Sequence, residues 1–493
     1  MEKLPSNMAK PVDIELSGSL HRVHTTDVGQ IEEVDAASVY RKVDWRIVPL
    51  MFLCYFLQFL DKVLVNYANI MGLQRDLEMA GQDFSWMATA FFIGYAVAEF
   101  PQAYLLQKFP VAKILGFNVL CWGITLCCTS GVQNFAGITA LRTLLGCFEA
   151  IITPALILTT SMWYTKKQGA PRYGIWYCGL GAGQIIGGLI SYAGQHGRTG
   201  VSFGGWRIMM MSVGVFNLVV AGAVLIWLPD SVSSAKFLTT SEKSFIQTRL
   251  VSDQSGTGKR VFKLSSLWET LVDLQVWLLF VLTVLIVIPS GVITTFSATL
   301  IRGFGFTPKT SALLNMPSGI LSIFATLSCT FAVLKDFPRW LGIIVLMVPT
   351  MIGAGLMSFL TPSNRAGVLT GIYLINFDVA PLALIYALVG SNTQGYTKKV
   401  ATNVLIAIAF SIANIIGPQT FQAREAPQYL GAKITIFGVC GGTIVFTILL
   451  RLLYGYRNTK AVKDSVSLDG NAMAMDGDED LTDMTNPAFR YVY

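Results

Sequence analysis

Long apolar runs separated by short polar stretches dominate the chain. A helix of about 20 residues crosses the hydrocarbon core of a bilayer, and most of these runs have about that length. The pattern therefore predicts an all-α membrane protein. We expect twelve transmembrane helices, at about 47–70, 84–106, 111–130, 135–158, 172–192, 206–228, 276–300, 311–334, 340–359, 367–389, 397–421 and 432–454.

A polar stretch divides the twelve helices into two sets of six. The pattern predicts a cytosolic N-terminal arm (1–43), an N-terminal six-helix half (44–228), a cytosolic linker (229–275), a C-terminal six-helix half (276–455) and an acidic cytosolic tail (456–493). We expect most of the tail to be disordered, because it is acidic and poor in large apolar residues. Two six-helix halves are typical of secondary transporters, which bind their substrate between the repeats near the bilayer midplane.

Basic residues near the helix ends lie mostly on one side of the predicted bundle. They flank the second helix, fill the linker and follow the last helix, whereas the opposite loops carry only a thin scatter of Lys and Arg. Cytoplasmic loops are enriched in these residues, so both termini and the linker are predicted to be cytoplasmic. An even number of helices agrees with that orientation.

The composition supports a membrane protein and argues against several other classes. Hydrophobic residues make up 53% of the chain and charged residues only 13%, with a mean hydropathy of +0.56. The net charge of +7 is modest and spread over loops, which makes nucleic acid an unexpected partner. The eight cysteines lie mainly in apolar segments without metal-ligand spacing, and the three histidines are scattered. We expect no metal, no cofactor and no enzyme chemistry.

The fourth predicted helix contains two charged residues in an otherwise apolar segment, 141–150. A charge at mid-bilayer is costly, so it needs a partner, a water-filled cavity or a task. Arg142 and Glu149 are seven residues apart, almost two helical turns, and therefore share one face. Gly146 lies between them and leaves room for a neighbouring helix or a ligand. A permanent cation and a titratable carboxylate on one stripe suggest anion binding coupled to a proton.

The first predicted helix adds a second pair of charges, Asp61 and Lys62. One interpretation is a structural ion pair that holds the first helix to the fourth. The other is that Lys62 and Arg142 bind an anion while Asp61 and Glu149 exchange protons. In the second case an arriving anion competes for the cations and raises the proton affinity of the carboxylates, so proton and anion bind better together. Symport follows from that linkage.

Five further polar residues lie within predicted helices. Glu99, near the cytosolic end of the second helix, is interpreted as a gating or interhelical residue. Asn414 precedes a Gly-Pro pair, which predicts a helix break near a binding site. Tyr67 and Gln184 are candidates for substrate contact, with packing as the alternative for Tyr67. Asp378 lies near a proline, so its side chain is expected either at a helix kink, where freed backbone groups accept polar neighbours, or facing the cavity.

Two short turns occupy corresponding places in the two halves. The first, at 109–113, ends in Lys113, and the second, at 336–339, contains Asp336 and Arg339. Each combines a proline with a basic residue after the second helix of its half. We interpret Lys113, Asp336 and Arg339 as gating residues at the cytosolic face.

Several of these segments together resemble one family, the fungal anion:cation symporters of the allantoate permease group, within the major facilitator superfamily. The resemblance implies anion binding by Arg142 and Lys62 and proton coupling by Asp61 and Glu149. Bacterial relatives of the wider group commonly have arginine in place of Lys62, and a lysine offers a point charge rather than a two-pronged fork. The resemblance rests on the segments 43–46, 59–62, 95–101, 142–150, 228–230, 235–238, 395–399, 414–419, 480–483 and 486–491.

The sequence thus predicts a proton-coupled symporter that takes up a small organic anion, such as a ureide or a vitamin carboxylate, by alternating access. Its expected partners are the anion, protons and the lipid bilayer, and we expect a monomer in the plasma membrane. Proton-driven efflux of an acidic metabolite is the alternative on the same fold. A nutrient sensor that does not transport is a third hypothesis, against which the short terminal arms argue.

Overall fold

The computed structural model describes residues 35–195, 204–254, 263–335, 337–361, 363–425, 429–467, 481–486 and 489–493. Within these ranges every regular element is a helix, as the apolar pattern predicts. The α-helices are α1 (Ala36–Ile70), α2 (Leu73–Asp76), α3 (Asp83–Lys108), α4 (Val111–Thr129), α5 (Phe135–Glu149), α6 (Ile152–Trp163), α7 (Lys166–Tyr177), α8 (Gly179–Gly194), α9 (Gly205–Trp227), α10 (Thr240–Gln254), α11 (Leu264–Val272), α12 (Leu274–Gly303), α13 (Pro308–Leu314), α14 (Met316–Leu334), α15 (Arg339–Phe359), α16 (Arg365–Ile375), α17 (Pro381–Asn392), α18 (Tyr396–Gln419) and α19 (Leu430–Ser467). Two short 3₁₀ turns, η1 (Asn376–Val379) and η2 (Ala423–Glu425), complete the order.

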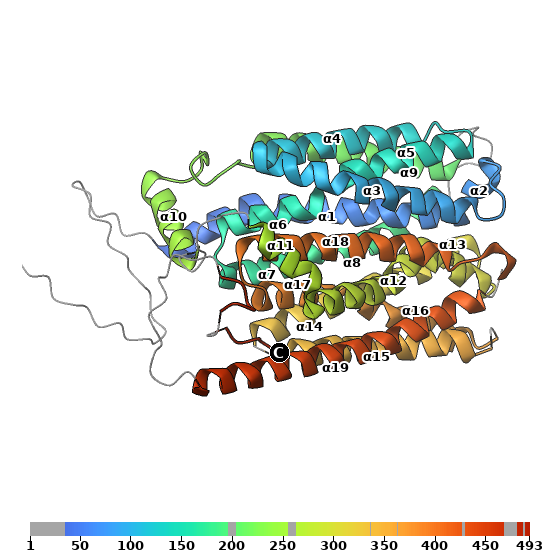
Figure 1. Cartoon of the computed structure of the whole chain (residues 1–493). Helices are drawn as coiled ribbons and strands as arrows, with labels where there is room; N and C mark the ends of the chain where they lie inside the picture. Colours follow the sequence, from blue (N-terminus) through green and yellow to red (C-terminus); the bar gives the residue numbers. More distant parts are fainter. Residues whose placement is uncertain are drawn as a thin grey trace, which may run out of the picture.

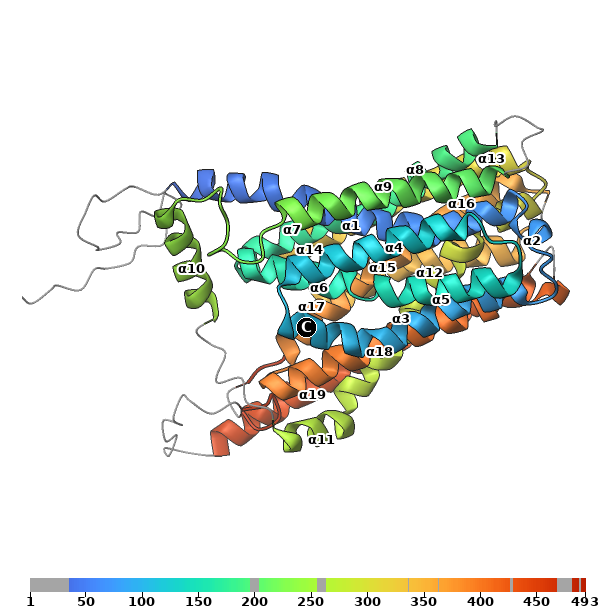
Figure 2. The same ribbon diagram turned by 90° about the horizontal axis from the view of Figure 1, so that it is seen from above.

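The helices form two bundles that lie side by side (Figure 1). Helices α1–α9 build the N-terminal half and α12–α19 the C-terminal half. The start of α1, the linker helix α10 and the chain's C-terminus lie at one end of the molecule, which we call the linker end (Figures 1 and 2). Helices α2 and α13 lie at the opposite end, the far end. Both described ends of the chain are therefore on the same side, and which side faces the cytoplasm stays a prediction.

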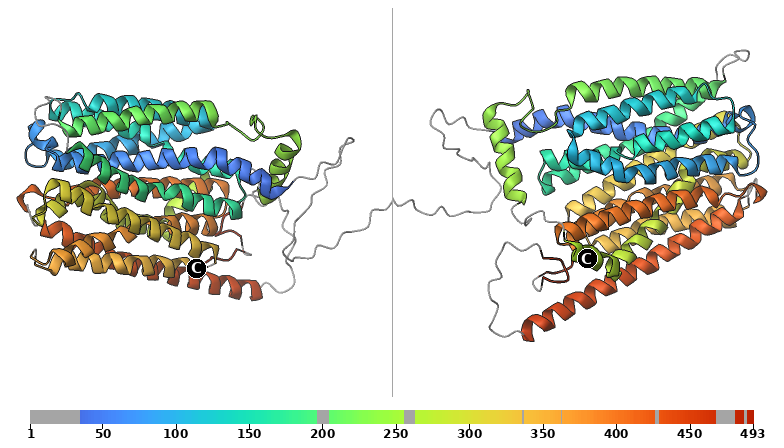
Figure 3. Two further views of the ribbon diagram at one scale, coloured as in Figure 1. Left: turned by 180° about the vertical axis from the view of Figure 1, so that it is seen from behind. Right: turned by 45° about the horizontal axis from the view of Figure 1, so that its top comes forward.

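Ten helical segments among the described residues are long and apolar enough to cross a membrane. Two of the twelve predicted crossings fall outside that set. One is α3, which carries Glu99, and the other is the pair α7 and α8, which begins with Lys166 and Lys167. Both lie within the bundle alongside the other helices (Figure 3). Their polar residues lower the hydropathy, so a total of twelve crossings stays a prediction.

The most extensive contacts between the two halves are those of α1 with α12, α3 with α18, and α8 with α14, and α7 and α8 also reach α14 and α13 respectively. The third pair depends on glycine. A Cβ atom added to Gly181 would lie 2.3 Å from the carbonyl oxygen of Gly319, and one added to Gly319 would lie 2.4 Å from that of Gly181. Real Cβ atoms do not approach so closely, so these backbones touch only because both residues lack a side chain.

Glycines also fix α5 against α3 inside the N-terminal half. A Cβ atom at Gly146 would lie 2.1 Å from the carbonyl oxygen of Phe91, and one at Gly94 would lie 2.2 Å from that of Thr143. The space beside Gly146 is therefore filled by a neighbouring helix, one of the two occupants that the sequence suggested. This contact holds the charged face of α5 in a fixed position.

Each half is tied together at the linker end by an acidic residue at its first helix. In the N-terminal half, Arg172 of α7 donates to Asp44 of α1 through Nη2 (2.7 Å) and Nε (3.0 Å), and the Tyr164 hydroxyl donates to the same carboxylate at 2.7 Å. In the C-terminal half, Lys398 of α18 lies 2.8 Å from Asp273 at the start of α12. Both ties join the first and fifth predicted helices of a half, which supports the internal repeat.

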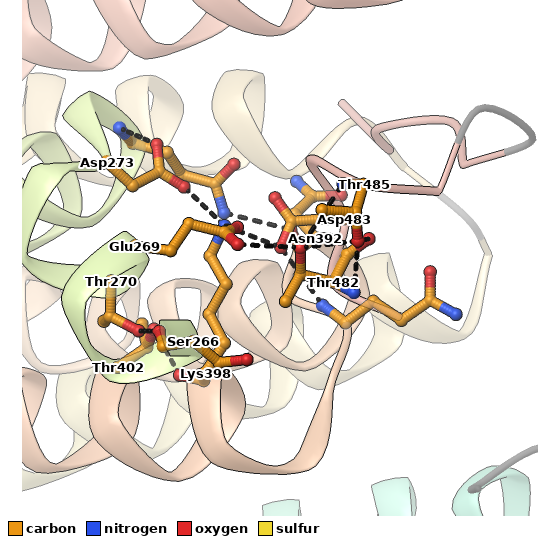
Figure 4. Close-up of polar contacts among 12 residues, drawn as sticks. Ser266, Glu269, Thr270, Asp273, Asn392, Lys398, Thr402, Thr482, Asp483 and Thr485 are labelled. Carbon is orange, nitrogen blue, oxygen red and sulfur yellow. Dashed lines mark hydrogen bonds and ion pairs between the residues drawn. The ribbon is translucent and has the colours of Figure 1, made fainter. Parts of the chain in front are cut away.

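The tie in the C-terminal half includes the last residues of the chain (Figure 4). Asp483 lies 3.0 Å from the Lys398 ammonium and accepts a hydrogen bond from the Tyr491 hydroxyl at 2.8 Å. Asn392 of α17 exchanges two hydrogen bonds with the backbone of Val492. At these residues the structure differs from the predicted disorder, because buried charges at the helix ends give the segment polar partners. Residues 468–480 lie outside the described ranges.

The two carboxylates beside Lys398 respond differently to burial. Burial raises the pKa of Asp483, against the lowering influence of Lys398. Burial acts in the same direction on Asp273 but is outweighed by the hydrogen bond from Arg457 and by the charge of Lys398, so the pKa of Asp273 falls below its ordinary value of 3.8. A lowered pKa means that charged Asp273 stabilises the folded protein above that value, and that the contribution is lost as the pH falls through the lowered pKa.

We therefore predict that Asp273→Asn lowers the thermal stability of the detergent-purified protein. The substitution leaves the cations Arg457 and Lys398 short of a buried anion, which costs about 3 kcal/mol. Thermal unfolding of the variant and the wild type is measured between neutral and acidic pH. The difference should be largest at neutral pH and shrink below the ordinary carboxyl range.

Glu78→Gln is the matched control, because Glu78 is an exposed carboxylate at the far end. It should unfold like the wild type at every pH. A destabilisation of Asp273→Asn that persisted unchanged into strong acid would contradict the ionic role of this residue.

Candidate functional site

A cavity of about 470 Å³ lies between the two halves. Residues of α1, α3, α6 and the α7–α8 pair line it from the N-terminal half, and residues of α12, η1, α17 and α18 line it from the C-terminal half. The lining extends to Ala103, Ser161 and Asn403, which lie near the linker ends of α3, α6 and α18. The cavity therefore extends toward the linker end of the molecule.

At the far end the two halves are bonded to each other. Asn66 of α1 donates to Ser297 of α12 at 2.8 Å, and Asn69 donates to Thr299 at 3.0 Å. Rings add apolar cover, since the ring of Phe296 lies 4.2 Å from that of Phe421 and also contacts Phe84. Further polar contacts between the halves are Gln419 to Thr89 and Arg302 to the carbonyl oxygen of Ile70. These contacts close the far end over the cavity.

Two ion pairs connect α1 to α5 beside the cavity. Asp61 lies 3.2 Å from Arg142, and Lys62 lies 3.9 Å from Glu149. The two pairs have opposite polarity. In the first, α1 supplies the acid (Asp61) and α5 the base (Arg142), and in the second, α1 supplies the base (Lys62) and α5 the acid (Glu149). The four residues that the sequence singled out are thus brought together, and each charge has an opposite partner.

The four charges differ in their access to the cavity. Lys62 lines it, whereas Asp61, Arg142 and Glu149 are not among its lining residues. Arg142 is 2% exposed, and Asp61 and Glu149 are 0% exposed. Lys62 and Arg142 also both line a small pocket of about 30 Å³, which is large enough to admit water. Lys62 therefore stands between the cavity and the buried charges behind it.

Glu149 occupies a break in its transmembrane segment. Helix α5 ends at Glu149 and α6 begins at Ile152, and the backbone carbonyl of Glu149 accepts a hydrogen bond from the Gln58 side chain at 3.3 Å. Within the described residues, neither carboxylate oxygen of Glu149 has a hydrogen-bond partner. An ionised carboxylate in that state relies mainly on Lys62 and more weakly on Arg142 for compensation, because buried charges need a partner.

Aromatic rings form much of the cavity wall near Lys62. The ammonium group lies 5.8 Å from the ring centre of Phe91 and 5.7 Å from that of Tyr95, within the range of cation–π contact. The contacts hold the lysine side chain between Glu149 and the cavity. Phe91 lines the small pocket rather than the main cavity. The aromatic residues of the main cavity besides Tyr95 are Tyr55, Phe59, Phe92, Phe100, Tyr177, Tyr386 and Phe410.

The other predicted site residues fall into separate places. Glu99 and Asn414 line the cavity. Tyr67 and Gln184 do not appear among its lining residues: the Tyr67 hydroxyl donates to the backbone carbonyl of Gln184 and accepts from Asn315, both at 3.1 Å. Both residues lie where α1 and α8 meet the α13–α14 junction, toward the far end. Their contact with a substrate stays a prediction.

Two of the three residues in the predicted gating turns, Lys113 and Arg339, lie in the described part of the chain. Lys113 is exposed at the start of α4. Arg339 bonds to Ser391 of α17, and its backbone amide donates to the carbonyl oxygen of Tyr493 at 3.0 Å. Asp336 lies outside the described residues. The predicted break in the eleventh helix is also displaced, because α18 continues through the Gly-Pro pair and ends at Gln419.

Gln58 and Asp378 are among the polar cavity residues that the sequence missed or left undecided. Gln58 lines the cavity one helical turn before Lys62, and that spacing on one face is the signal that would have found it. Asp378 lines the cavity from η1 and also lies at a helix interruption, so both alternatives for it hold. Within the described residues, no group of three or more His, Cys, Asp or Glu side chains could hold a metal ion.

Comparisons with known proteins agree with this architecture. The chain is 35% identical over 465 residues to a thiamine pathway transporter of Saccharomyces cerevisiae, covering 92% of this chain and 86% of the relative. It is 31% identical to the allantoate permease of the same yeast, covering 91% and 85%. An uncharacterized transporter of Schizosaccharomyces pombe is 37% identical, covering 94% of this chain and 91% of the relative.

Solved structures confirm the fold. A D-xylose–proton symporter matches with a TM-score of 0.63 at 12% identity, covering 82% of this chain and 97% of the other. A bacterial homologue of the lysosomal transporter Spinster, captured facing inward, matches with a TM-score of 0.58 at 17% identity, covering 82% and 94%. The family model of the Major Facilitator Superfamily matches residues 51–418. The chain therefore belongs to the major facilitator superfamily, a family of membrane transporters rather than enzymes, and its relatives include fungal permeases.

Proposed function

We propose that this transporter takes up a small organic anion together with a proton, by alternating access. The observation that carries the proposal is the Lys62–Glu149 pair, in which one partner faces the cavity and the other is buried behind it. The 31% identity to an allantoate permease supports a carboxylate-bearing substrate such as a ureide. We further propose the plasma membrane as its location and a monomer as the working unit.

Lys62 is the proposed anion contact. It is the cation that lines the main cavity among its described lining residues, and the aromatic rings beside it exclude water from one side. A carboxylate that enters the cavity competes with Glu149 for this ammonium group. The 3.9 Å separation of Lys62 and Glu149 is longer than a hydrogen bond, so the existing pair is open to such competition.

Glu149 is the proposed proton carrier. When the substrate takes over Lys62, Glu149 is left as a buried carboxylate without its closest cation, and binding a proton removes the cost of that charge. Proton and substrate then favour each other's binding, and thermodynamic linkage makes the preference mutual. The lysine, the bound anion and the neutral acid together carry less net charge across the membrane than the anion alone.

Asp61 and Arg142 are proposed to anchor α1 to α5 and to keep the charge balance around the site. Their pair is shorter, at 3.2 Å, and both residues are buried away from the main cavity. Proton exchange at Asp61 and substrate contact at Arg142 would require this pair to open. The small pocket shared by Lys62 and Arg142 gives such an opening a place to begin.

The structure supplies one end of the proposed alternating-access cycle. The far end is closed by contacts between α1 and α12, and the cavity extends to the linker end. With the linker in the cytoplasm, this is an inward-facing state. Opening the far end requires the Asn66–Ser297 and Asn69–Thr299 bonds to break while the halves rotate about the central site.

We predict that Glu149→Gln abolishes accumulation of substrate driven by external acid but preserves exchange of labelled for unlabelled substrate. Glutamine keeps the size of the side chain but cannot take up a proton, so transport loses its coupling and not its path. Uptake and exchange of labelled allantoate and related carboxylates are measured in proteoliposomes at acidic and neutral external pH.

The exposed variant Glu78→Gln controls for expression and reconstitution and should accumulate substrate like the wild type. If Glu149→Gln still accumulated the anion against its gradient, Glu149 would not be the coupling residue.

We also predict that Asp61→Asn with Arg142→Gln is more stable than Arg142→Gln alone. The single change leaves Asp61 buried without its cation, at a cost of about 3–5 kcal/mol, whereas the double change removes both charges. Thermal unfolding of the purified variants measures the difference. Equal stability of the single and double variants would show that this pair does not anchor α1 to α5.

A further inference from the structure

Asp378 is a buried carboxylate in the C-terminal half that the coupling mechanism does not use. It belongs to η1, the short 3₁₀ turn that interrupts the predicted tenth helix between α16 and α17. Helix interruptions inside a membrane protein are tolerated where the backbone is buried in protein or lines a cavity, and they are common at transporter binding sites. Asp378 lines the same cavity as Lys62.

Two backbone carbonyl groups beside this interruption have partners, but one oxygen of the Asp378 carboxylate does not. The Tyr177 hydroxyl donates to the carbonyl oxygen of Val379 at 3.2 Å, and the Cys329 thiol lies 3.7 Å from that of Ala380. Asp378 is 2% exposed, and its Oδ2 atom has no hydrogen-bond partner within the described residues. A structural role for the turn is therefore satisfied without this oxygen.

The lining contains three charged groups: Lys62 and Glu99 on the N-terminal half, and Asp378 on the C-terminal half. We call Lys62 and Asp378, which lie on opposite halves, the two poles of the cavity. Lys62 on α1 offers a positive charge, and Asp378 on η1 offers a negative one. Asn414 on α18 adds an amide to the same lining. A simple anion would satisfy Lys62 and leave the Asp378 carboxylate buried without compensation, at a cost of several kcal/mol. A ligand with both a carboxylate and a cationic nitrogen would satisfy both poles at once.

We infer that Asp378 binds a positively charged or strongly hydrogen-bond-donating nitrogen of the substrate, so that the transporter selects small zwitterions over simple anions. The inference rests on the proposed function, because the substrate carboxylate still binds Lys62. The aromatic side chains of the lining, among them Tyr177 and Tyr386, suit a cationic nitrogen, which aromatic faces attract.

The same contact gives the substrate a role in moving the halves. A zwitterion that spans the cavity is attracted to α1 of one half and to η1 of the other. It therefore draws the two walls together and favours an occluded state, whereas a ligand with only one charged group holds only one half. Only a molecule that binds both Lys62 and Asp378 therefore uses its binding free energy to stabilise the occluded state.

The test uses pairs of labelled molecules that differ mainly in one amino group: β-alanine with propionate, γ-aminobutyrate with butyrate, and phenylalanine with hydrocinnamate. Uptake of each is measured in proteoliposomes containing wild type, Asp378→Asn or Asp378→Glu. We expect the wild type to prefer at least one amino-bearing member about tenfold. Asp378→Asn should reduce its uptake about tenfold while sparing the deaminated partner, and Asp378→Glu should restore part of the preference.

The wild-type preference is a test in itself if a variant does not fold. Equal uptake within every pair, or a preference that persists in Asp378→Asn, would overturn the assignment of Asp378. Uptake of simple carboxylates without any preference would overturn this inference alone and leave the proposed function standing. Absence of uptake for every member of the panel, and for allantoate, would overturn both.

Discussion

The two ion pairs between α1 and α5 are the interaction on which the rest of the site depends. Two charges lie in an otherwise apolar stretch of α1 and two in one of α5, and each is paired with an opposite charge on the facing helix. Isolated charges at that depth would cost several kcal/mol each, so the pairs fix the relative position of the two helices. Because only Lys62 also lines the cavity, the balance among the four is open to a ligand at a single point.

Close packing makes this arrangement rigid enough to act as a unit. Glycines at 94 and 146 bring α3 and α5 into backbone contact, and Gly181 and Gly319 do the same between the halves. At the linker end, Asp44 and Asp273 tie the first helix of each half to its fifth. Ion pairs and close packing thus stabilise each half internally. The contacts described between the halves at the far end are hydrogen bonds and ring contacts. Such a structure favours motion of one half against the other.

The helical fold and the central charges could be predicted from the sequence, because apolar length and the cost of buried charge leave few alternatives. Helical spacing places Arg142 and Glu149 on one face of their helix. Because the rest of that helix is apolar, residues of opposite charge to pair with them are expected on another helix. Which distant segment a given residue contacts could not be predicted. Tyr67 packs at the far end rather than in the cavity, and the last residues pack beside Lys398, because both depend on distant segments that no local pattern specifies.

The central claim is that an anion at Lys62 makes Glu149 take up a proton. The most direct measurement is the release or uptake of protons when a transported carboxylate binds to the purified protein in weakly buffered solution, followed with a pH indicator. The account predicts uptake of about one proton per bound substrate in the wild type and none in Glu149→Gln. Binding without proton uptake in the wild type, or equal uptake in both proteins, would contradict it.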